Sequence, residues 1–330
     1  MRKSYSATDD SPVRSVVACV VVFVMSLATA FGKEPVSYHT IRVGELDIFY
    51  RESGPKDGPA ILLLHGLPSS SRMYQPLLES ALSEKYHLIA PDYPGFGHSS
   101  WPDHRAFQYT FDHLAAVIQE FTEELHLNRY VLFMQDYGGP VGFRMALAHP
   151  QRVQAMIVQN AVSHEEGLSA LWEVRRAFWQ DRAGHEAKVR ANLLSLEATR
   201  QRHVGTSPHP ELLNPDSWVD EYYFLNQPGQ GDIQLDLFYD YQNNVKSYPV
   251  WQQWLRDYQP PLLALWGRYD PSFTVAGAEA YRRDVPSAEV HILDAGHFAM
   301  DLLPDEVIRL TGSFLKTLRP GTAGNQVGCR

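Results

Sequence analysis

The sequence predicts an α/β protein in which a doubly wound, mostly parallel β-sheet carries an inserted helical segment. Apolar, strand-like runs alternate with helix-like segments from about residue 60 to residue 162, which is the pattern of βαβ units. The alternation stops over residues 163–259, where the chain has helical character and many aromatic residues, and it resumes at residue 260. A chain of 330 residues with 44% hydrophobic residues is long enough to bury such a core.

The first strands follow from their hydrophobic patterns. Polar and apolar residues alternate over residues 36–50, which predicts two antiparallel strands. Residues 60–64 are Ala-Ile-Leu-Leu-Leu, a continuous apolar run of the kind that parallel sheets bury on both faces. A helix that Ser70 or Ser71 caps is expected to run to about residue 85. The next strand is then expected at residues 87–90.

The following helix begins at Thr110 or Asp112, either of which is a favourable N-cap residue. It carries apolar side chains at helical spacing: Leu114, Val117, Ile118, Phe121 and Leu125. Further strands are expected at residues 131–135 and 155–162, and a helix between them at residues 139–149.

The last part of the chain returns to the α/β pattern. Strands are expected at residues 261–267 and 289–293, a helix near residues 276–284, and an amphipathic helix at residues 304–318. The predicted core therefore comprises residues 31–162 and 260–318. Residues 163–259 form a helical lid between its strands, and residues 319–330 form a flexible tail.

Residues 1–30 have the pattern of a signal peptide. Three basic residues precede an apolar run over residues 16–27, and the segment ends in Ala28-Thr29-Ala30. Because this run is short for a membrane span, cleavage after Ala30 and export to the periplasm or the exterior are expected. An uncleaved N-terminal anchor is the alternative.

Charge and cysteine content exclude several classes of function. The net charge is -9 without a basic cluster, so nucleic acid is not an expected partner. Cys19 and Cys329 are the two cysteines, which leaves one after export and excludes an intramolecular disulfide or a zinc framework. There is no His-rich cluster with ligand spacing and no phosphate-binding glycine loop. No metal or cofactor is therefore expected, and the expected partners are a small hydrophobic substrate and water.

An acidic residue, Asp136, stands where a strand turns sharply into a helix. Residues 131–139, Val-Leu-Phe-Met-Gln-Asp-Tyr-Gly-Gly, have the strand–turn–helix pattern of a nucleophile elbow. A carboxyl group with a reference pKa of about 3.9 is ionised at neutral pH, so it can attack without a base. Attack on an sp³ carbon gives an alkyl–enzyme ester that water must cleave. The alternative is that Asp136 only caps the following helix.

Other motifs accompany Asp136 in a fixed order. They are His65-Gly66, the loop at residues 92–99, Trp266-Gly267-Arg268-Tyr269-Asp270, and Ala295-Gly296-His297-Phe298. Nearly all of the chain beyond residue 30 thus resembles the α/β-hydrolase superfamily. The resemblance implies that Asp136 is the nucleophile, that His297 activates water, and that Asp270 orients the imidazole. Asp294 and Glu165 are weaker candidates for the acid.

The same resemblance implies an oxyanion hole formed by the backbone N–H groups of Leu67 and Tyr137. His65 is expected to support this loop rather than to react. An aspartate at the elbow narrows the resemblance to epoxide hydrolases and to haloalkane or haloacid dehalogenases. Haloalkane dehalogenases commonly have Asn and Trp at the positions of Leu67 and Tyr137, and both side chains donate to the halide.

Because leucine has no donor, the resemblance favours an epoxide hydrolase, in which a lid tyrosine protonates the opened ring. Tyr241 is the expected donor, and packing in the lid is the alternative role. Other tyrosines stand near it in the sequence: Tyr222, Tyr223, Tyr239 and Tyr248. Trp172, Trp179 and Phe298 are further candidates for substrate contact, although the spacing of the tryptophans also fits core packing.

Two alternative functions stay open at this point. A haloalkane dehalogenase would use the same nucleophile, and Gln135 before the elbow aspartate also occurs in some of these enzymes. A ligand-binding protein that kept the fold would not need Asp136, Asp270 and His297 together. Turnover of an epoxide or a haloalkane would decide between these functions.

Overall fold

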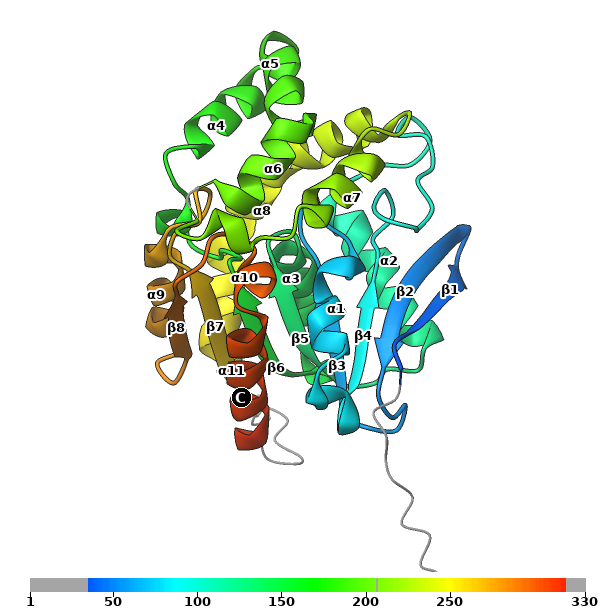
Figure 1. Cartoon of the computed structure of the whole chain (residues 1–330), viewed down its shortest axis with the longest axis vertical. Helices are drawn as coiled ribbons and strands as arrows, with labels where there is room; N and C mark the ends of the chain where they lie inside the picture. The colour runs from blue at the N-terminus through cyan, green and yellow to red at the C-terminus, as the bar shows by residue number, and fades with distance from the viewer. Residues whose placement is uncertain (1–34, 206, 319–330) are drawn as a thin grey trace, which may run out of the picture. The chain divides into compact units, whose positions relative to one another are not determined.

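The computed structural model describes residues 35–205 and 207–318, and this part of the chain contains an eight-stranded β-sheet (Figure 1). The strand order is β1-β2-β4-β3-β5-β6-β7-β8. The pairs β1–β2 and β2–β4 are antiparallel, whereas the remaining neighbours are parallel. The order reverses between β3 and β5, so the carboxyl ends of these two strands mark the usual ligand-binding position of such sheets. The predicted fold class is confirmed.

The strands have the following bounds: β1 (Ser37–Val43), β2 (Leu46–Ser53), β3 (Ala60–Leu64), β4 (His87–Pro91), β5 (Tyr130–Gln135), β6 (Val153–Gln159), β7 (Leu262–Gly267) and β8 (Glu289–Leu293). Strands β3, β4, β5 and β7 are buried along their whole length. Successive side chains point to opposite faces of a sheet, so Leu62 and Leu64 join one apolar cluster while Ile61 and Leu63 join another. The continuous apolar runs in the sequence reflect this burial on both faces.

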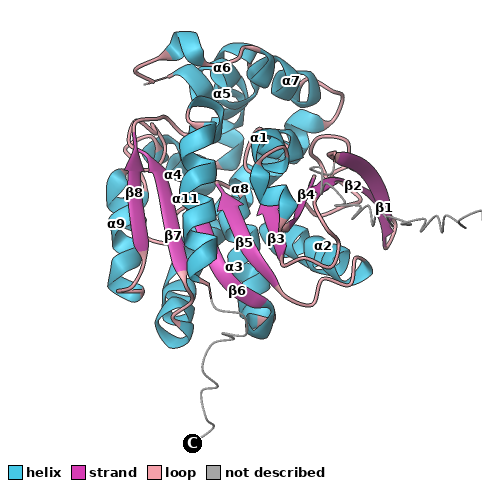
Figure 2. Ribbon diagram, turned by 60° about the horizontal axis from the view of Figure 1, so that its bottom comes forward, coloured by secondary structure: helices cyan, strands magenta, loops and turns pink. Residues whose placement is uncertain are grey.

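Helices cover both faces of the sheet (Figure 2). Their bounds in the core are α1 (Gln75–Leu78), α2 (Phe111–Glu124), α3 (Gly138–Ala148), α9 (Val275–Asp284), α10 (Ala299–Leu302) and α11 (Pro304–Thr317). The described residues also form 3₁₀ helices. In the core these are η1 (Ser71–Tyr74), η2 (Ala81–Glu84) and η3 (Pro150–Arg152), and between β6 and β7 they are η4 (Glu165–Gly167) and η5 (Pro210–Leu212). Thr110 caps α2, because its side chain accepts a hydrogen bond from the N–H of His113 at 3.2 Å.

The prediction of a single helix up to residue 85 is wrong. The chain there forms η1, α1 and η2 in succession. Ser80 separates α1 from η2, because its hydroxyl donates to the carbonyl of Leu77 at 2.6 Å and accepts from the N–H of Leu82 at 3.2 Å. This local side-chain bonding competes with the helical pattern and stops α1 after one turn.

The segment between β6 and β7 forms five helices: α4 (Trp172–Gln180), α5 (Arg182–Leu194), α6 (Leu196–Val204), α7 (Asp216–Leu225) and α8 (Gln230–Tyr258). Figure 1 shows α4 to α7 together above one end of the sheet. The long helix α8 connects this insertion to the core. Near its start Phe238 packs against Phe178 of α4, and near its end Trp251 stacks on Phe143 of α3, with ring centroids 4.9 Å apart.

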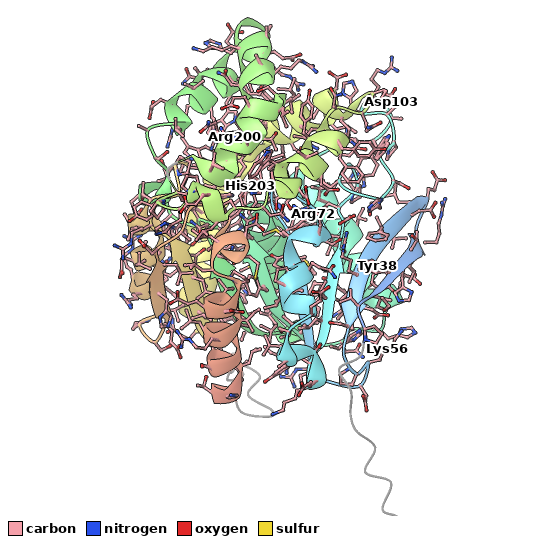
Figure 3. All side chains as sticks on the ribbon, viewed as in Figure 1. Tyr38, Lys56, Arg72, Asp103, Arg200 and His203 are labelled. Atoms are coloured by element: carbon pink, nitrogen blue, oxygen red, sulfur yellow. The ribbon has the colours of Figure 1, made fainter. Side chains whose placement is uncertain are left out.

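A buried cluster of charges joins the helical insertion to the core around His203 (Figure 3). Its imidazole lies 2.7 Å from Glu221 of α7 and 2.9 Å from Asp301 of α10. Burial alone would lower the pKa of His203, but the two carboxylates outweigh burial and raise it to about 9. The ring also stacks on Phe298 at 4.1 Å between centroids. These contacts attach α6 and α7 to α10 and to the residue that precedes it.

The predicted signal peptide at residues 1–30 and the predicted tail at residues 319–330 lie outside the described residues. Among the helices of residues 35–205 and 207–318, none is both long and apolar enough to cross a membrane.

Candidate active site

Asp136 lies directly after β5, at the tip of a tight turn into α3. Its backbone adopts a positive φ of 47°, which non-glycine residues adopt rarely and mostly at functional sites. The turn passes close to β3, because a Cβ on Gly138 would stand 2.1 Å from the carbonyl oxygen of Leu64. A Cβ on Gly66 would likewise stand 2.3 Å from the Cβ of Asp136. The strand–turn–helix pattern in the sequence therefore corresponds to a true elbow, with the carboxylate at its apex.

Two backbone N–H groups donate to the Asp136 carboxylate. The N–H of Leu67 lies 2.9 Å from Asp136 Oδ1, and the N–H of Tyr137 also donates to this side chain. Burial raises the pKa of the Asp136 carboxyl, while His297, both N–H groups and Arg175 act to lower it. The structure thus brings the two predicted oxyanion-hole residues to the predicted nucleophile.

The loop that carries Leu67 is supported by His65. The Nε2 atom of His65 accepts a hydrogen bond from the N–H of Tyr93 at 3.2 Å. Its ring also stacks on the ring of Tyr93, with centroids 4.1 Å apart. Because both interactions fix the imidazole in the loop, its position agrees with a supporting role.

His297 lies between two aspartates. Its Nδ1 is 2.7 Å from Asp270 Oδ2, and its Nε2 is 3.7 Å from Asp136 Oδ2. The side-chain amide of Gln135 also lies 2.9 Å from Nε2. Burial alone would lower the pKa of His297, but the negative charges of Asp270 and Asp136 outweigh it, so the pKa lies above the ordinary 6.5. The structure therefore brings together the three residues that the sequence selected.

The Asp270 carboxylate is held by several donors besides His297. Asn160, at the end of β6, donates to Oδ2 at 2.8 Å. The N–H groups of Ser272 and Phe273 donate to Oδ1 at 2.7 and 3.1 Å. Asn160 also accepts from the N–H of Gly267 at 2.9 Å, which ties β6 to β7. These bonds fix the orientation of Asp270 and through it the imidazole.

The two weaker candidates for the acid lie elsewhere. Asp294 has a side chain that is 60% exposed and lies 3.9 Å from Arg268. Glu165 has a side chain that is 62% exposed and lies 3.3 Å from Arg176. Because His297 Nδ1 is already bonded to Asp270, neither side chain is placed to orient the ring.

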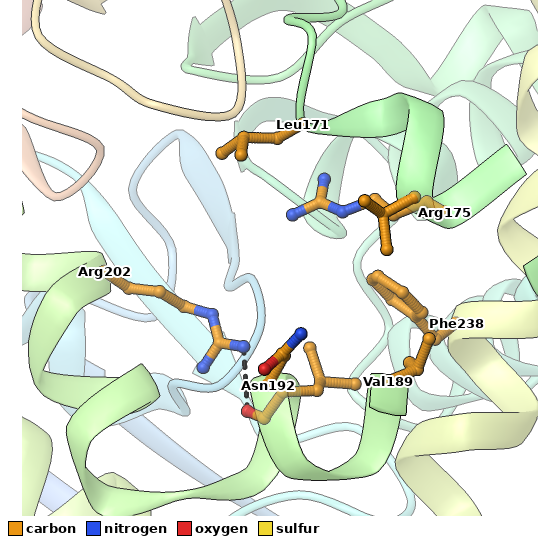
Figure 4. Close-up of a pocket in the computed structure, with 8 residues that line it drawn as sticks. Leu171, Arg175, Val189, Asn192, Arg202 and Phe238 are labelled. Atoms are coloured by element: carbon orange, nitrogen blue, oxygen red, sulfur yellow. Dashed lines mark hydrogen bonds between the residues drawn. The ribbon is translucent and has the colours of Figure 1, made fainter. Parts of the chain in front are cut away.

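One cavity adjoins Asp136, and a second cavity shares part of its wall. The inner one has a volume of about 30 Å³, and its walls include Leu67, Tyr137, Trp172 and His297 together with Asp136 itself. The outer one has a volume of about 210 Å³ and lies among α4, α5, α6 and α8 (Figure 4). Three residues line both cavities: Arg175, Arg202 and Phe238. In residues 35–205 and 207–318, no group of three or more His, Cys, Asp or Glu side chains is arranged to hold a metal ion.

The predicted substrate-contact residues differ in their placement. Trp172 lines the inner cavity, but its indole N–H donates to the carbonyl of Ser272 at 2.9 Å. Trp179 is not part of either cavity wall, and its indole N–H donates to the carbonyl of Phe238 at 2.9 Å. Neither indole N–H is therefore free to bind a leaving halide.

The other two predicted contact residues lie behind the cavity walls. Tyr241 packs behind Trp172 and Tyr137, with ring centroids 4.6 and 5.9 Å away. Phe298 packs on His203 and against His297. Both side chains are almost completely buried, and both support residues that do contact the cavities.

Arg175 and Arg202 were not selected from the sequence. Each stands close to another basic residue of its helix, Arg176 or Arg200, and no motif surrounds either. Gln135 and Asn160 were likewise not recognised as groups that contact His297 and Asp270. Nothing in the local sequence separates these residues from ordinary polar ones.

Comparisons with known proteins place the chain in a family. The profile of the alpha/beta hydrolase fold family matches residues 59–302. An uncharacterised hydrolase of Saccharomyces cerevisiae is 39% identical over 270 residues, which cover 80% of this chain and 92% of that protein. A haloalkane dehalogenase of Psychrobacter cryohalolentis is 26% identical over 283 residues, which cover 82% of this chain and 88% of the other.

Solved structures agree with this fold. A mutant of the haloalkane dehalogenase DatA from Agrobacterium tumefaciens superposes with a TM-score of 0.73 at 22% identity, over 87% of this chain and 99% of the other. The epoxide hydrolase CorEH superposes with a TM-score of 0.68 at 18% identity, over 86% and 100% of the two chains. The chain therefore belongs to the alpha/beta hydrolase fold family and is a hydrolase of that fold.

Proposed function

We propose that this hydrolase opens an epoxide through a covalent ester on Asp136. The observation that carries the proposal is the position of this carboxylate. It stands at the elbow, with the N–H of Leu67 2.9 Å from one oxygen and the imidazole of His297 3.7 Å from the other. A carboxylate held in this way is a nucleophile for an sp³ carbon, and the imidazole is a base for the water that follows.

The first step forms the ester. An Asp136 oxygen attacks an epoxide carbon, the carbon–oxygen bond of the ring breaks, and the released oxygen takes a proton from a donor to become a hydroxyl group. In the second step His297 Nε2 removes a proton from water, and the oxygen of that water attacks the ester carbonyl carbon. The N–H groups of Leu67 and Tyr137 stabilise the negative charge on the tetrahedral intermediate. When the intermediate collapses, the bond to the product oxygen breaks, and this oxygen takes the proton of the newly added hydroxyl group. A diol leaves and Asp136 is again a carboxylate. The proton on His297 then returns to the donor that was deprotonated in the first step.

Tyr137 is the better supported proton donor for the ring oxygen. It lines the inner cavity, and its buried hydroxyl has no hydrogen-bond partner among the described residues. The Tyr241 hydroxyl, by contrast, interacts with that of Tyr248 and lies behind the cavity wall. Burial raises the pKa of both Tyr137 and Tyr241, so both stay protonated at neutral pH. We therefore propose Tyr137 as the donor in place of Tyr241.

Exchange of each tyrosine for phenylalanine should separate the two roles. Tyr137→Phe should slow single-turnover ester formation from an epoxide by about 10²-fold, which is the usual size of a lost general acid. Tyr241→Phe should change this rate much less, because its hydroxyl contacts Tyr248. Thermal unfolding of both variants controls for packing. A larger rate loss in Tyr241→Phe would return the donor role to that residue.

A haloalkane dehalogenase is the second candidate function. The relationship to the Psychrobacter enzyme favours it, and the same carboxylate would displace a halide. Halide departure, however, calls for donors around the leaving group. The indole N–H groups of Trp172 and Trp179 are bonded to carbonyls, and the side chain of Leu67 has no donor. The inner cavity is also lined by Tyr137, Arg175 and Arg202, whose side chains carry donors. Because the Tyr137 hydroxyl can give a proton to the ring oxygen, we favour the epoxide reaction.

A single turnover in ¹⁸O-labelled water tests the covalent mechanism. Enzyme in excess over an epoxide should release a first diol without label, because its new oxygen comes from Asp136. The label should remain on Asp136, and mass spectrometry of the digested protein would locate it. Label in the first diol, with none on Asp136, would mean direct attack by water. A parallel assay of halide release from haloalkanes decides between the two candidates, and turnover of neither class would favour a ligand-binding protein.

A further inference from the structure

Two arginines from the helical insertion face the space next to the proposed nucleophile. Arg175 extends from α4 and Arg202 from α6, and both line the inner and the outer cavity. Figure 4 shows their guanidinium groups extending toward one another from opposite sides of the outer cavity. The wall that the two cavities share therefore carries two positive charges.

Neither guanidinium is neutralised within the part of the chain that the structure describes. Arg175 donates to the hydroxyl of Ser272 at 3.3 Å and lies over the ring of Trp172 at 4.0 Å, but it forms no ion pair there. Arg202 donates to the carbonyl of Leu193 at 2.8 Å. Its Nη1 atom is shielded from solvent and has no hydrogen-bond partner among the described residues.

Neighbouring arginines on the same helices behave differently. Arg176 lies 3.3 Å from Glu165, and Arg200 lies 3.4 Å from Glu197. These two pairs lie at the surface, where ion pairs contribute little stability. On α4 and α6, the arginines without a carboxylate partner are thus the two that line the cavities.

The burial of these two charges makes the cavities less favourable without a bound anion. Burial and the proximity of Arg175 lower the pKa of Arg202 to about 10, and burial also lowers the pKa of Arg175. Both groups nevertheless remain charged at neutral pH. Both side chains are only partly buried. Two like charges without hydrogen-bonded counterions are still unfavourable there, and an anion between them would relieve part of that cost.

The nearby carboxylates of the site are not available for this purpose. Asp270 is bonded to His297, to Asn160 and to two backbone N–H groups. Asp136 accepts from the backbone at Leu67 and Tyr137, and Glu221 lies 2.7 Å from His203. Both carboxylates attract the guanidinium groups from a distance, but neither forms an ion pair with Arg175 or Arg202 in the described part of the chain. A ligand can therefore supply the directly bonded anion that the two arginines lack.

We propose that the substrate carries a carboxylate group, which Arg175 and Arg202 hold while the epoxide reaches Asp136. The planar fork of a guanidinium matches the two oxygens of a carboxylate. The inner cavity of about 30 Å³ holds few atoms, so the carboxylate and the epoxide are close in a short epoxy acid. This inference rests on the proposed function and replaces the expected hydrophobic substrate with an anionic one.

A matched pair of substrates tests the proposal. 3,4-Epoxybutanoate and 3,4-epoxybutanamide have the same carbon skeleton and differ in charge. The wild-type enzyme should prefer the acid in kcat/KM by about 10- to 100-fold, as expected for the loss of one or two charge-assisted hydrogen bonds in the amide. Arg202→Gln should abolish this preference, mainly through a higher KM for the acid.

The controls use the same substitution on the same helices. Arg200 lies on α6 and Arg176 lies on α4, and neither residue lines the inner or the outer cavity. The variants Arg200→Gln and Arg176→Gln should therefore keep the wild-type preference for the acid. Arg175→Gln should reduce the preference as Arg202→Gln does. Arg202→Lys keeps the charge and should keep part of the preference. Thermal unfolding identifies any variant that fails to fold. If Arg202→Gln fails to fold, the preference of Arg202→Lys for the acid is compared with that of the wild type instead.

Binding without turnover separates this inference from the proposed function. Calorimetric titration with butanoate should show binding that Arg202→Gln weakens by at least about tenfold. If neither epoxide is turned over but butanoate binds in this way, the proposed reaction fails while the anion site stands. Equal turnover of acid and amide, or a preference that persists in Arg202→Gln, would overturn the site. Arg202-dependent binding of inorganic phosphate without butanoate binding would overturn the carboxylate assignment.

Discussion

Replacement of Asp136 by asparagine should lower kcat for the epoxide by at least about 10³-fold, which is typical when a nucleophile that acts with a base is removed. The amide keeps the shape of the side chain and can still accept from the N–H of Leu67, but it cannot attack carbon as a carboxylate does. Steady-state kinetics of diol formation measure the loss. Asp294→Asn is the matched control, because its side chain is 60% exposed and should leave kcat unchanged.

The same substitution should not destabilise the fold. Burial raises the pKa of Asp136, so the folded state holds the ionised form less favourably than the unfolded state does. A carboxyl group with a raised pKa lowers stability as the pH rises through that pKa, so the neutral amide removes this cost at neutral pH. The melting temperature of Asp136→Asn should therefore equal or exceed that of the wild type. A large loss of stability together with the loss of activity would point to a structural role instead.

Replacement of His297 by glutamine should stop the reaction after the ester has formed. Ester formation needs the carboxylate of Asp136, whereas cleavage needs the base 3.7 Å away. The variant should therefore accumulate a stable adduct, while its steady-state turnover falls by at least about 10³-fold. Intact-mass spectrometry distinguishes the two candidate reactions, since an epoxide adds as a whole molecule and a haloalkane adds only its alkyl group.

Peptide mapping should locate that adduct on Asp136. The double variant Asp136→Asn, His297→Gln is the control, and it should form no adduct with either substrate. An adduct on another residue, or none although the wild type turns the substrate over, would contradict a nucleophilic Asp136. A whole-molecule adduct with an epoxide, but none with haloalkanes, would favour the epoxide hydrolase function over the haloalkane dehalogenase function.

The sequence by itself determined the sheet and the elbow. Strands buried on both faces must be apolar throughout, so β3 and β5 are visible as continuous runs. The turn at Asp136 needs small residues at Gly66 and Gly138, because other chain segments pass within 2.1 to 2.3 Å of the positions of their absent Cβ atoms. The burial of a strand and the tight packing of a turn each constrain a few consecutive residues. The residue types in these short stretches therefore reveal the strand and the turn.

Only the tertiary structure decided which polar residues of the helical insertion face the nucleophile. Helix α6 is short and mostly polar, and its sequence does not show which side packs inward. Helix α4 is amphipathic, but its two adjacent arginines stand between apolar residues, so the sequence does not show which arginine faces the cavities. Arg175 and Arg176 are adjacent in the chain, yet one lines the cavities and the other pairs with Glu165. Contacts between segments far apart in the chain determine which of the two arginines faces the cavities. Such contacts also determine the pairing of Asn160 with Asp270. Such contacts place no local constraint on the amino-acid pattern, so the sequence alone could not reveal the two arginines.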